Sequence, residues 1–202
     1  MDITFLLIAI LALFLFSYEI KDAKSIMLLA IWSSIVAFLG LKGVFVEKPH
    51  FLAIVLVGTT LICLTIIQLL KNRRFNIKTL LLIHILRIPV EFILYKLFIS
   101  NQLPIIMTFR GYNFDILIGL CALLILIGLK FFDQSKLKSI IRIWSVFGMI
   151  SLSSVLLMGI LSSPIPIQQF AFDQPNVAVL YFPFVLLPTL LVPIVFMSHI
   201  FI

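Results

Sequence analysis

The sequence predicts an all-α integral membrane protein, one seven-transmembrane-helix bundle formed by residues 1–202. Composition is the first reason: the chain is 63% hydrophobic and 11% charged, with a mean hydropathy of +1.28. Soluble domains are about 45–50% apolar and about 25% charged. The second reason is that the apolar residues fall into stretches of roughly 20, the length of a helix that crosses a bilayer. The loops between them are too short for a second domain.

Seven segments have this length and character. The first is short, follows Asp2 rather than a basic region, and reads as a retained helix. The second carries Lys42 near one end, where its long side chain can reach the headgroups. The seventh contains Pro183, Pro188 and Pro193, so we expect it to be kinked or locally unwound. The predicted segments are residues 3–18, 25–46, 51–70, 79–99, 114–131, 139–161 and 177–201.

The basic residues predict the orientation of the bundle. Ten of the fifteen Lys and Arg lie in the first, third and fifth loops with their flanks, and the sixth loop has none. Because cytoplasmic loops are enriched in Lys and Arg, we expect the N-terminus outside and the C-terminus in the cytoplasm. The net charge of +7 then reflects membrane boundaries and anionic lipid, and we expect no nucleic-acid partner. The composition is typical of a bacterial inner (plasma) membrane protein.

Ionisable side chains inside the fourth segment mark a candidate site. Arg87 and Glu91 are four residues apart and share one helix face, with His84 a turn below them and Tyr95 a turn above. An ionised group in the hydrocarbon costs about 2.5–3.5 kcal/mol, so such residues usually face a protein interior or a wet cavity. We therefore predict that Arg87 points into the bundle.

Two polar loops, around residues 108–115 and 168–176, are expected on the outer side of the membrane, toward which this helix runs. They predict an outward-facing polar cavity over the fourth helix. The guanidinium has five donors, so we predict that Arg87 reaches at least one carboxylate, from Glu91, Asp115 or Asp173. The predicted ligand-binding residues are Arg87, Glu91, Tyr95, Asn113, Asp115, Gln169, Asp173 and Asn176.

The leading hypothesis is a small polytopic membrane protein that binds or transports a small polar or amphipathic ligand, lipids included, in this cavity. Arg87 would hold an anionic group or a carboxylate, and Glu91 would be its counter-ion or a proton-linked switch. A second hypothesis is a membrane enzyme that acts on a lipid or isoprenoid through Glu91, Asp115 and Asp173. A third is a structural subunit of a larger membrane complex. The sequence identifies no catalytic residue.

A purely structural interpretation competes with all three hypotheses. In this interpretation, Arg87 pairs with Glu91 or Asp115 only to hold the helices together, and Asp115 and Asn176 only cap helices. His84 and the other histidine of the cytoplasmic half, His199, make a bis-histidine haem conceivable, but their expected depths in the membrane match imperfectly. We expect no metal and no cofactor. The expected partners are membrane lipids, a small-molecule ligand, and either a second copy or another membrane subunit.

Overall fold

The computed structural model describes residues 2–202 of the chain and shows helices and no strand in that range, which confirms the all-α fold class. Most elements are α-helices, with two 3₁₀ turns (η1 and η2) and one π-helical turn (η3). In chain order they are α1 (Asp2–Ile20), α2 (Ala23–Leu41), α3 (Val44–Glu47), α4 (Phe51–Leu70), α5 (Ile77–Ile85), α6 (Arg87–Ile99), η1 (Ile105–Met107), α7 (Asp115–Gly128), α8 (Gln134–Leu161), η2 (Ala178–Leu180), η3 (Leu187–Leu191) and α9 (Val192–Ile200).

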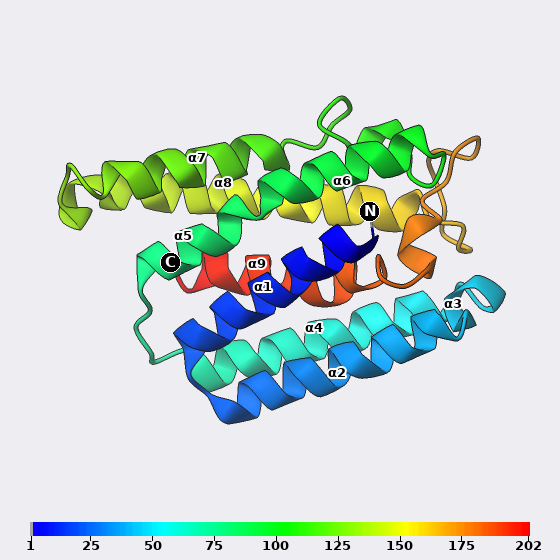
Figure 1. The fold of residues 1–202 in the computed structure, drawn as a ribbon, viewed down its shortest axis with the longest axis horizontal. Coiled ribbons are helices and arrows are strands. Elements are labelled where there is room, and N and C mark those ends of the chain that lie inside the picture. Colours follow the sequence, from blue (N-terminus) through cyan, green and yellow to red (C-terminus); the bar gives the residue numbers. More distant parts are fainter. Residues whose placement is uncertain (1) are drawn as a thin grey trace.

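The helices lie side by side along the long axis of the molecule. In Figure 1, α7 and α8 form one side, α2 and α4 form the other, and α1 and α9 lie between them. The face that α1 buries follows helical periodicity through Phe5, Ala9, Ala12, Phe16 and Ile20, each at most 1% exposed. The hydrophobic core therefore surrounds the first helix.

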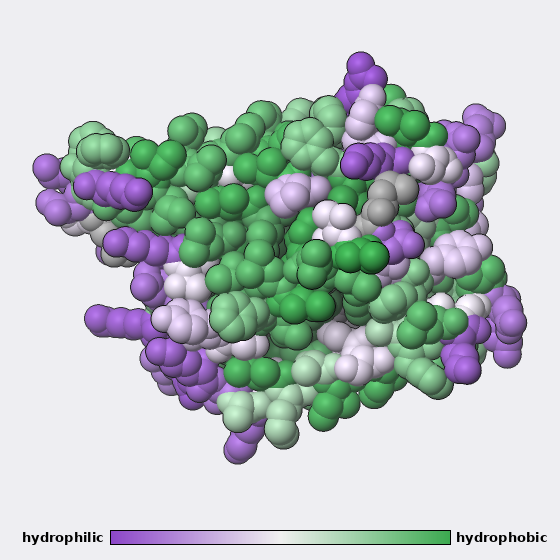
Figure 2. Space-filling view, viewed as in Figure 1, coloured by the Kyte–Doolittle hydropathy of each residue, from purple (hydrophilic) through white to green (hydrophobic). Residues whose placement is uncertain are grey.

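Four helices are long and apolar enough to cross a membrane: α1, α2, α4 and residues 135–161 of α8. Figure 2 shows hydrophobic residues in a broad band, with hydrophilic residues gathered toward the two ends of the molecule. The residues exposed along this band include many Leu, Ile and Phe side chains. A surface of this kind requires lipid rather than water around it, so the chain is a membrane protein.

The predicted continuous helix over residues 79–99 is wrong. Helix α5 ends at Ile85 and α6 begins at Arg87, with Leu86 in a turn between them. Pro89 explains the break, because a proline has no N–H to donate to the carbonyl four residues earlier, here that of Ile85. The break places Arg87 at the start of a helix.

Two other predicted segments also differ from the structure. The second, predicted over 25–46, ends at Leu41, and Gly43 turns the chain with a φ of 71° before α3. The seventh, predicted over 177–201, contains only the short 3₁₀ turn η2 before Leu187, where η3 begins and leads into α9. Local unwinding was expected there, and the π-helical turn at Pro188 confirms it.

The loops gather at two ends of the bundle. The first and third loops meet at one end, where Nη2 of Arg73 lies 3.1 Å from Oδ1 of Asp22 and Nη1 donates to the carbonyl of Ile20 at 3.0 Å. Phe201 reaches the same end and stacks on Phe75. The fourth and sixth loops meet at the other end, where the N–H of Ala178 donates to the carbonyl of Gln102. Basic residues gather at the end with the C-terminus: the first and third loops with their flanks carry six, and Lys138 and Arg142 line a cavity together with Ile202.

Candidate functional site

Arg87 lies in the interior, with 3% of its surface exposed, and forms an ion pair with Asp115. These are the first residues of α6 and α7, so two helix starts face each other across the bundle. Nη2 of Arg87 donates to Oδ1 of Asp115, which also accepts the hydroxyl of Ser151 at 2.6 Å. The prediction that Arg87 points inward and reaches a carboxylate is confirmed.

Glu91 lies one turn along α6 and is 2% exposed. Its Oε1 accepts a hydrogen bond from Nδ2 of Asn113 at 2.6 Å, and the carbonyl of Met107 accepts from the same nitrogen at 3.0 Å. Oδ1 of Asn113 in turn accepts the N–H of Asp115 at 2.9 Å. Asn113 therefore joins the two carboxyl groups, and Arg87 pairs with Asp115 rather than with Glu91.

His199 of α9 extends the polar contacts on the other side of Arg87. Its Nε2 lies 3.0 Å from Nη1 of Arg87, and its Nδ1 lies 3.1 Å from the hydroxyl of Ser145. Trp144 and His84 pack against the imidazole, with ring centroids 5.0 and 3.9 Å away. Gly148 leaves room for this ring, because a Cβ at that position would overlap it.

We call this group the central cluster. Hydrogen bonds and the ion pair connect helices α6, α7, α8 and α9 with the loop before α7, and α5 contributes an imidazole, that of His84, which packs against His199. Its members are His84, Arg87, Glu91, Asn113, Asp115, Ser145, Ser151 and His199.

Several buried polar atoms of the central cluster lack a hydrogen-bond partner within the described residues. Among residues 2–202, no hydrogen-bond partner lies near Nε of Arg87, Oε2 of Glu91 or either ring nitrogen of His84. Each such buried group costs about 1–3 kcal/mol if it remains unsatisfied. The cluster also has two carboxyl groups for one arginine, so it would carry a net negative charge with both ionised. It therefore suits a proton, a cation or a small donor-bearing molecule.

The remaining predicted residues lie elsewhere. Tyr95 is half-buried, and its hydroxyl accepts from Nη1 of Arg110 at 2.8 Å. Gln169 and Asp173 are exposed in the sixth loop and take no part in the central cluster. Asn176 is buried but lines a separate apolar cavity. The structure thus assembles four of the eight predicted residues, and each of the four is at most 6% exposed.

The predicted cap at Asp115 is also wrong. The side chain of Asp115 pairs with Arg87, while Asn113 accepts the first N–H of α7. Asn176 does not act as an N-cap either. Its Oδ1 accepts no hydrogen bond within residues 2–202, and its Nδ2 instead donates at 3.2 Å to the carbonyl of Gly159, in the last turn of α8. The carboxylate of Asp173 does not join Glu91 and Asp115, so the three-carboxylate site imagined for an enzyme is not assembled.

Sequence reasoning missed Ser145, Ser151 and His199 as members of the cluster. Ser145, Gly148 and Ser151 recur every third residue and so line one side of α8, a pattern that could have pointed to a close and polar helix contact. The two histidines do share a depth, but their rings touch and leave no space for a haem iron between them. Within the described range, no group of three or more His, Cys, Asp or Glu is placed to hold a metal ion.

Residues 48–202 match the model of a protein family described as a domain of unknown function, DUF8737. The chain belongs to this family. The DUF8737 match contains every member of the central cluster and leaves out α1 and α2. No curated protein and no solved structure matches the chain.

Proposed function

We propose that this chain is a small multi-pass membrane carrier whose central cluster binds a proton at Glu91 together with a small polar ligand. The observation behind the proposal is the combination of a buried ion pair, a second carboxyl group without a cation, and unsatisfied donors and acceptors beside it. Ionisable residues that face a bundle interior are characteristic of proton relays and substrate pathways in membrane proteins.

The charges of the cluster favour a proton, a cation or a neutral hydrogen-bonding ligand over an anion. Arg87 is already paired with Asp115, so an anion would have to displace that carboxylate and then lie near Glu91. A proton on Glu91 removes the excess negative charge and supplies a donor at the unpartnered oxygen. Exchange of that proton changes the charge of the cluster, and this change would couple proton binding at Glu91 to binding of the polar ligand.

We propose seven membrane crossings, with the N-terminus outside and the C-terminus in the cytoplasm of a bacterial plasma membrane. Four crossings would be the long helices. The broken pair α5 and α6, the shorter α7, and the segment of η3 and α9 would supply the other three. The grouping of the first and third loops at the end that holds the C-terminus supports this arrangement, because positive loops favour the cytoplasm.

Proton movement through purified protein in liposomes tests the proposal. A valinomycin-mediated potassium potential would drive protons inward, and a trapped pH-sensitive dye would report their arrival. We expect the wild-type protein to acidify the lumen faster than empty liposomes do. E91Q should fall to the rate of empty liposomes, since glutamine retains the acceptor for Asn113 but carries no exchangeable carboxyl proton.

Glu47 supplies the matched control, because its carboxylate is exposed in α3 at one end of the bundle. E47Q should acidify the lumen at the wild-type rate. A wild-type protein that is correctly inserted but moves no protons, or an E91Q variant that moves them as well as the wild type, would contradict proton carriage by Glu91. A structural subunit would give the first of these results.

A further inference from the structure

A second candidate site lies in a mostly apolar groove away from the central cluster. Side chains of α4, α8, η3 and α9 line it, and it consists of two adjoining cavities that share five residues. The larger cavity has about 480 Å³ of space and the smaller about 40 Å³. The shared residues are Leu56, Leu156, Ile160, Pro188 and Val192.

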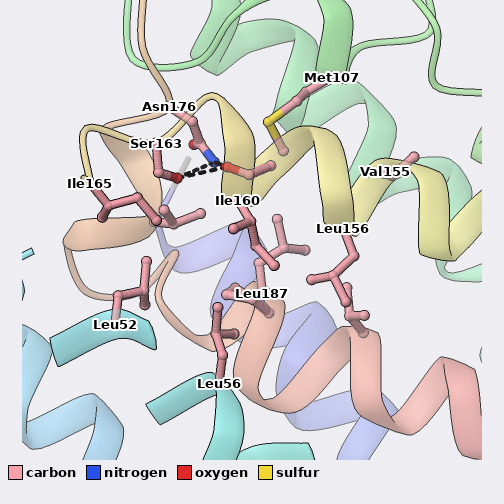
Figure 3. A pocket seen from close by; sticks show the side chains of 14 residues that line it. Leu52, Leu56, Met107, Val155, Leu156, Ile160, Ser163, Ile165, Asn176 and Leu187 are labelled. Atoms are coloured by element: carbon pink, nitrogen blue, oxygen red, sulfur yellow. Dashed lines mark hydrogen bonds between the residues drawn. The ribbon is translucent and has the colours of Figure 1, made fainter. Parts of the chain in front are cut away.

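One end of the groove carries an unsatisfied acceptor. Asn176 lines the smaller cavity and is 0% exposed, and its Oδ1 has no hydrogen-bond partner within residues 2–202. The amide nitrogen is held in place, because it donates to the carbonyl of Gly159 at 3.2 Å and lies 3.4 Å from the hydroxyl of Ser163. Figure 3 shows Asn176 and Ser163 together at one side of the cavity, with leucine and isoleucine side chains around the rest.

The lining selects the chemistry of an occupant. Among the described residues that line the two cavities, none is charged, so nothing there would compensate an ionised headgroup. Oδ1 of Asn176 accepts hydrogen bonds and therefore requires a donor. A water molecule can donate this hydrogen bond at the narrow end. Water does not fill the rest of the groove, because apolar cavities stay dry. A peptide helix, about 10–12 Å wide, is too broad for the smaller cavity.

We propose that the groove holds one alkyl chain of an uncharged membrane amphiphile, with a hydroxyl of its headgroup donating to Oδ1 of Asn176. The chain would lie over η3 and α9 between α4 and α8, where the groove meets the surrounding lipid. Asn176 lies at the end of the bundle that holds the fourth and sixth loops, so the headgroup would sit near that membrane surface. This site shares no residue with the central cluster.

Photolabelling in nanodiscs tests the proposal with a long-chain alcohol that carries a diazirine in its alkyl chain. The comparison probe is the methyl ether of the same alcohol, which has the same chain but no donor. We expect saturable labelling of α4 and α8 residues of the groove, competed by unlabelled alcohol. The ether should label them roughly fivefold less, the ratio expected for one neutral hydrogen bond.

Two variants separate the acceptor from the groove. N176L should reduce labelling by the alcohol to the level of the ether, since it removes Oδ1. L156W leaves Asn176 intact and fills the shared part of the groove, so it should abolish labelling by both probes. L124W places the same residue on an exposed position of α7 and should label like the wild type. E91Q should also label normally, because the two sites are separate.

Three results would overturn the proposal. Equal labelling by alcohol and ether would mean that Asn176 selects no donor and the groove holds bulk lipid only. Labelling that persists in L156W would place the probe elsewhere. The absence of saturable labelling in a folded wild-type protein would mean that water alone satisfies Asn176.

Discussion

Residues 2–202 contain two Arg–Asp ion pairs in opposite surroundings. Arg73 and Asp22 join two loops at one end of the bundle, and their side chains are 46% and 20% exposed. Arg87 and Asp115 join two helices in the interior, and theirs are 3% and 8% exposed. The first pair is open to solvent, so its remaining hydrogen-bonding capacity faces water. The second depends on protein groups alone, and around it the protein does not supply enough of them.

The contrast is the reason why we assign the proposed function to the interior pair. An exposed pair contributes little to stability, because solvent screens it. A buried pair has to overcome desolvation, so replacing it with apolar residues is often neutral or stabilising. The interior pair here is accompanied by Glu91, which adds a further buried carboxyl group. Buried charges in this arrangement contribute little to stability, and this supports a functional role for the central cluster.

The largest effect we expect is from R87A. Removal of the arginine leaves Asp115 buried without its cation, at a cost of about 3–5 kcal/mol in the free energy of unfolding. Thermal unfolding in detergent, followed by tryptophan fluorescence, measures the loss. The double variant R87A/D115N should recover part of it, since residue 115 is then uncharged and no longer needs a cation beside it. If the double variant is as unstable as R87A, the cost does not come from the ion pair.

A smaller effect is expected from G148A. The new methyl group would overlap the ring of His199 and force α8 and α9 apart, at about 1–3 kcal/mol. G128A is the matched control, because its Cβ would lie 3.6 Å from the nearest atom, an ordinary contact with Leu137. Equal melting temperatures for the two variants would contradict the packing of His199 against α8.

R73A should cost less than either, under about 1 kcal/mol, because the Arg73–Asp22 pair is exposed. Added salt should reduce the difference between R73A and the wild type further, whereas it should leave the R87A difference nearly unchanged. Unfolding measured at low and high salt checks both statements. A salt-sensitive R87A difference would mean that solvent reaches the interior pair.

The smallest effect concerns pH at the exposed pair. Hydrogen bonds from Ser25, and then the charge of Arg73, hold the pKa of Asp22 below its ordinary value of 3.8. A carboxyl group with a lowered folded-state pKa stabilises the fold above its unfolded pKa and loses this contribution as the pH falls. The stability advantage of the wild type over D22N should therefore shrink below pH 3.8. An advantage that grows in acid would contradict the assignment.

Much of the fold followed from the sequence, because apolar length and the cost of buried charge are local properties. They predicted an all-α membrane protein and the inward position of Arg87 with a carboxylate partner. The break before α6 was also readable, since Pro89 lies in the sequence four residues after Ile85. The position of Arg87 opposite the start of α7 was not readable, because it depends on how the two helices pack.

The site was only half predictable. Four members of the cluster lie in adjacent segments, so their expected depth in the membrane was enough to predict that they meet; they are Arg87, Glu91, Asn113 and Asp115. His199 and the serines of α8 join them through side-chain contacts between residues 36 to 112 positions apart in sequence, which no local pattern encodes. Gln169 and Asp173 were grouped with the cluster because they share a membrane side, but shared depth does not make two residues neighbours.

The most direct test of the account is whether Glu91 itself holds an exchangeable proton. Infrared difference spectra of the protein in lipid, recorded during a pH titration in H₂O and in D₂O, report the carbonyl band of a protonated carboxyl group. We predict a band that shifts on deuteration, changes with pH, and is missing in E91Q but present in E47Q. Identical spectra for the wild type and E91Q would contradict the proposed role of Glu91.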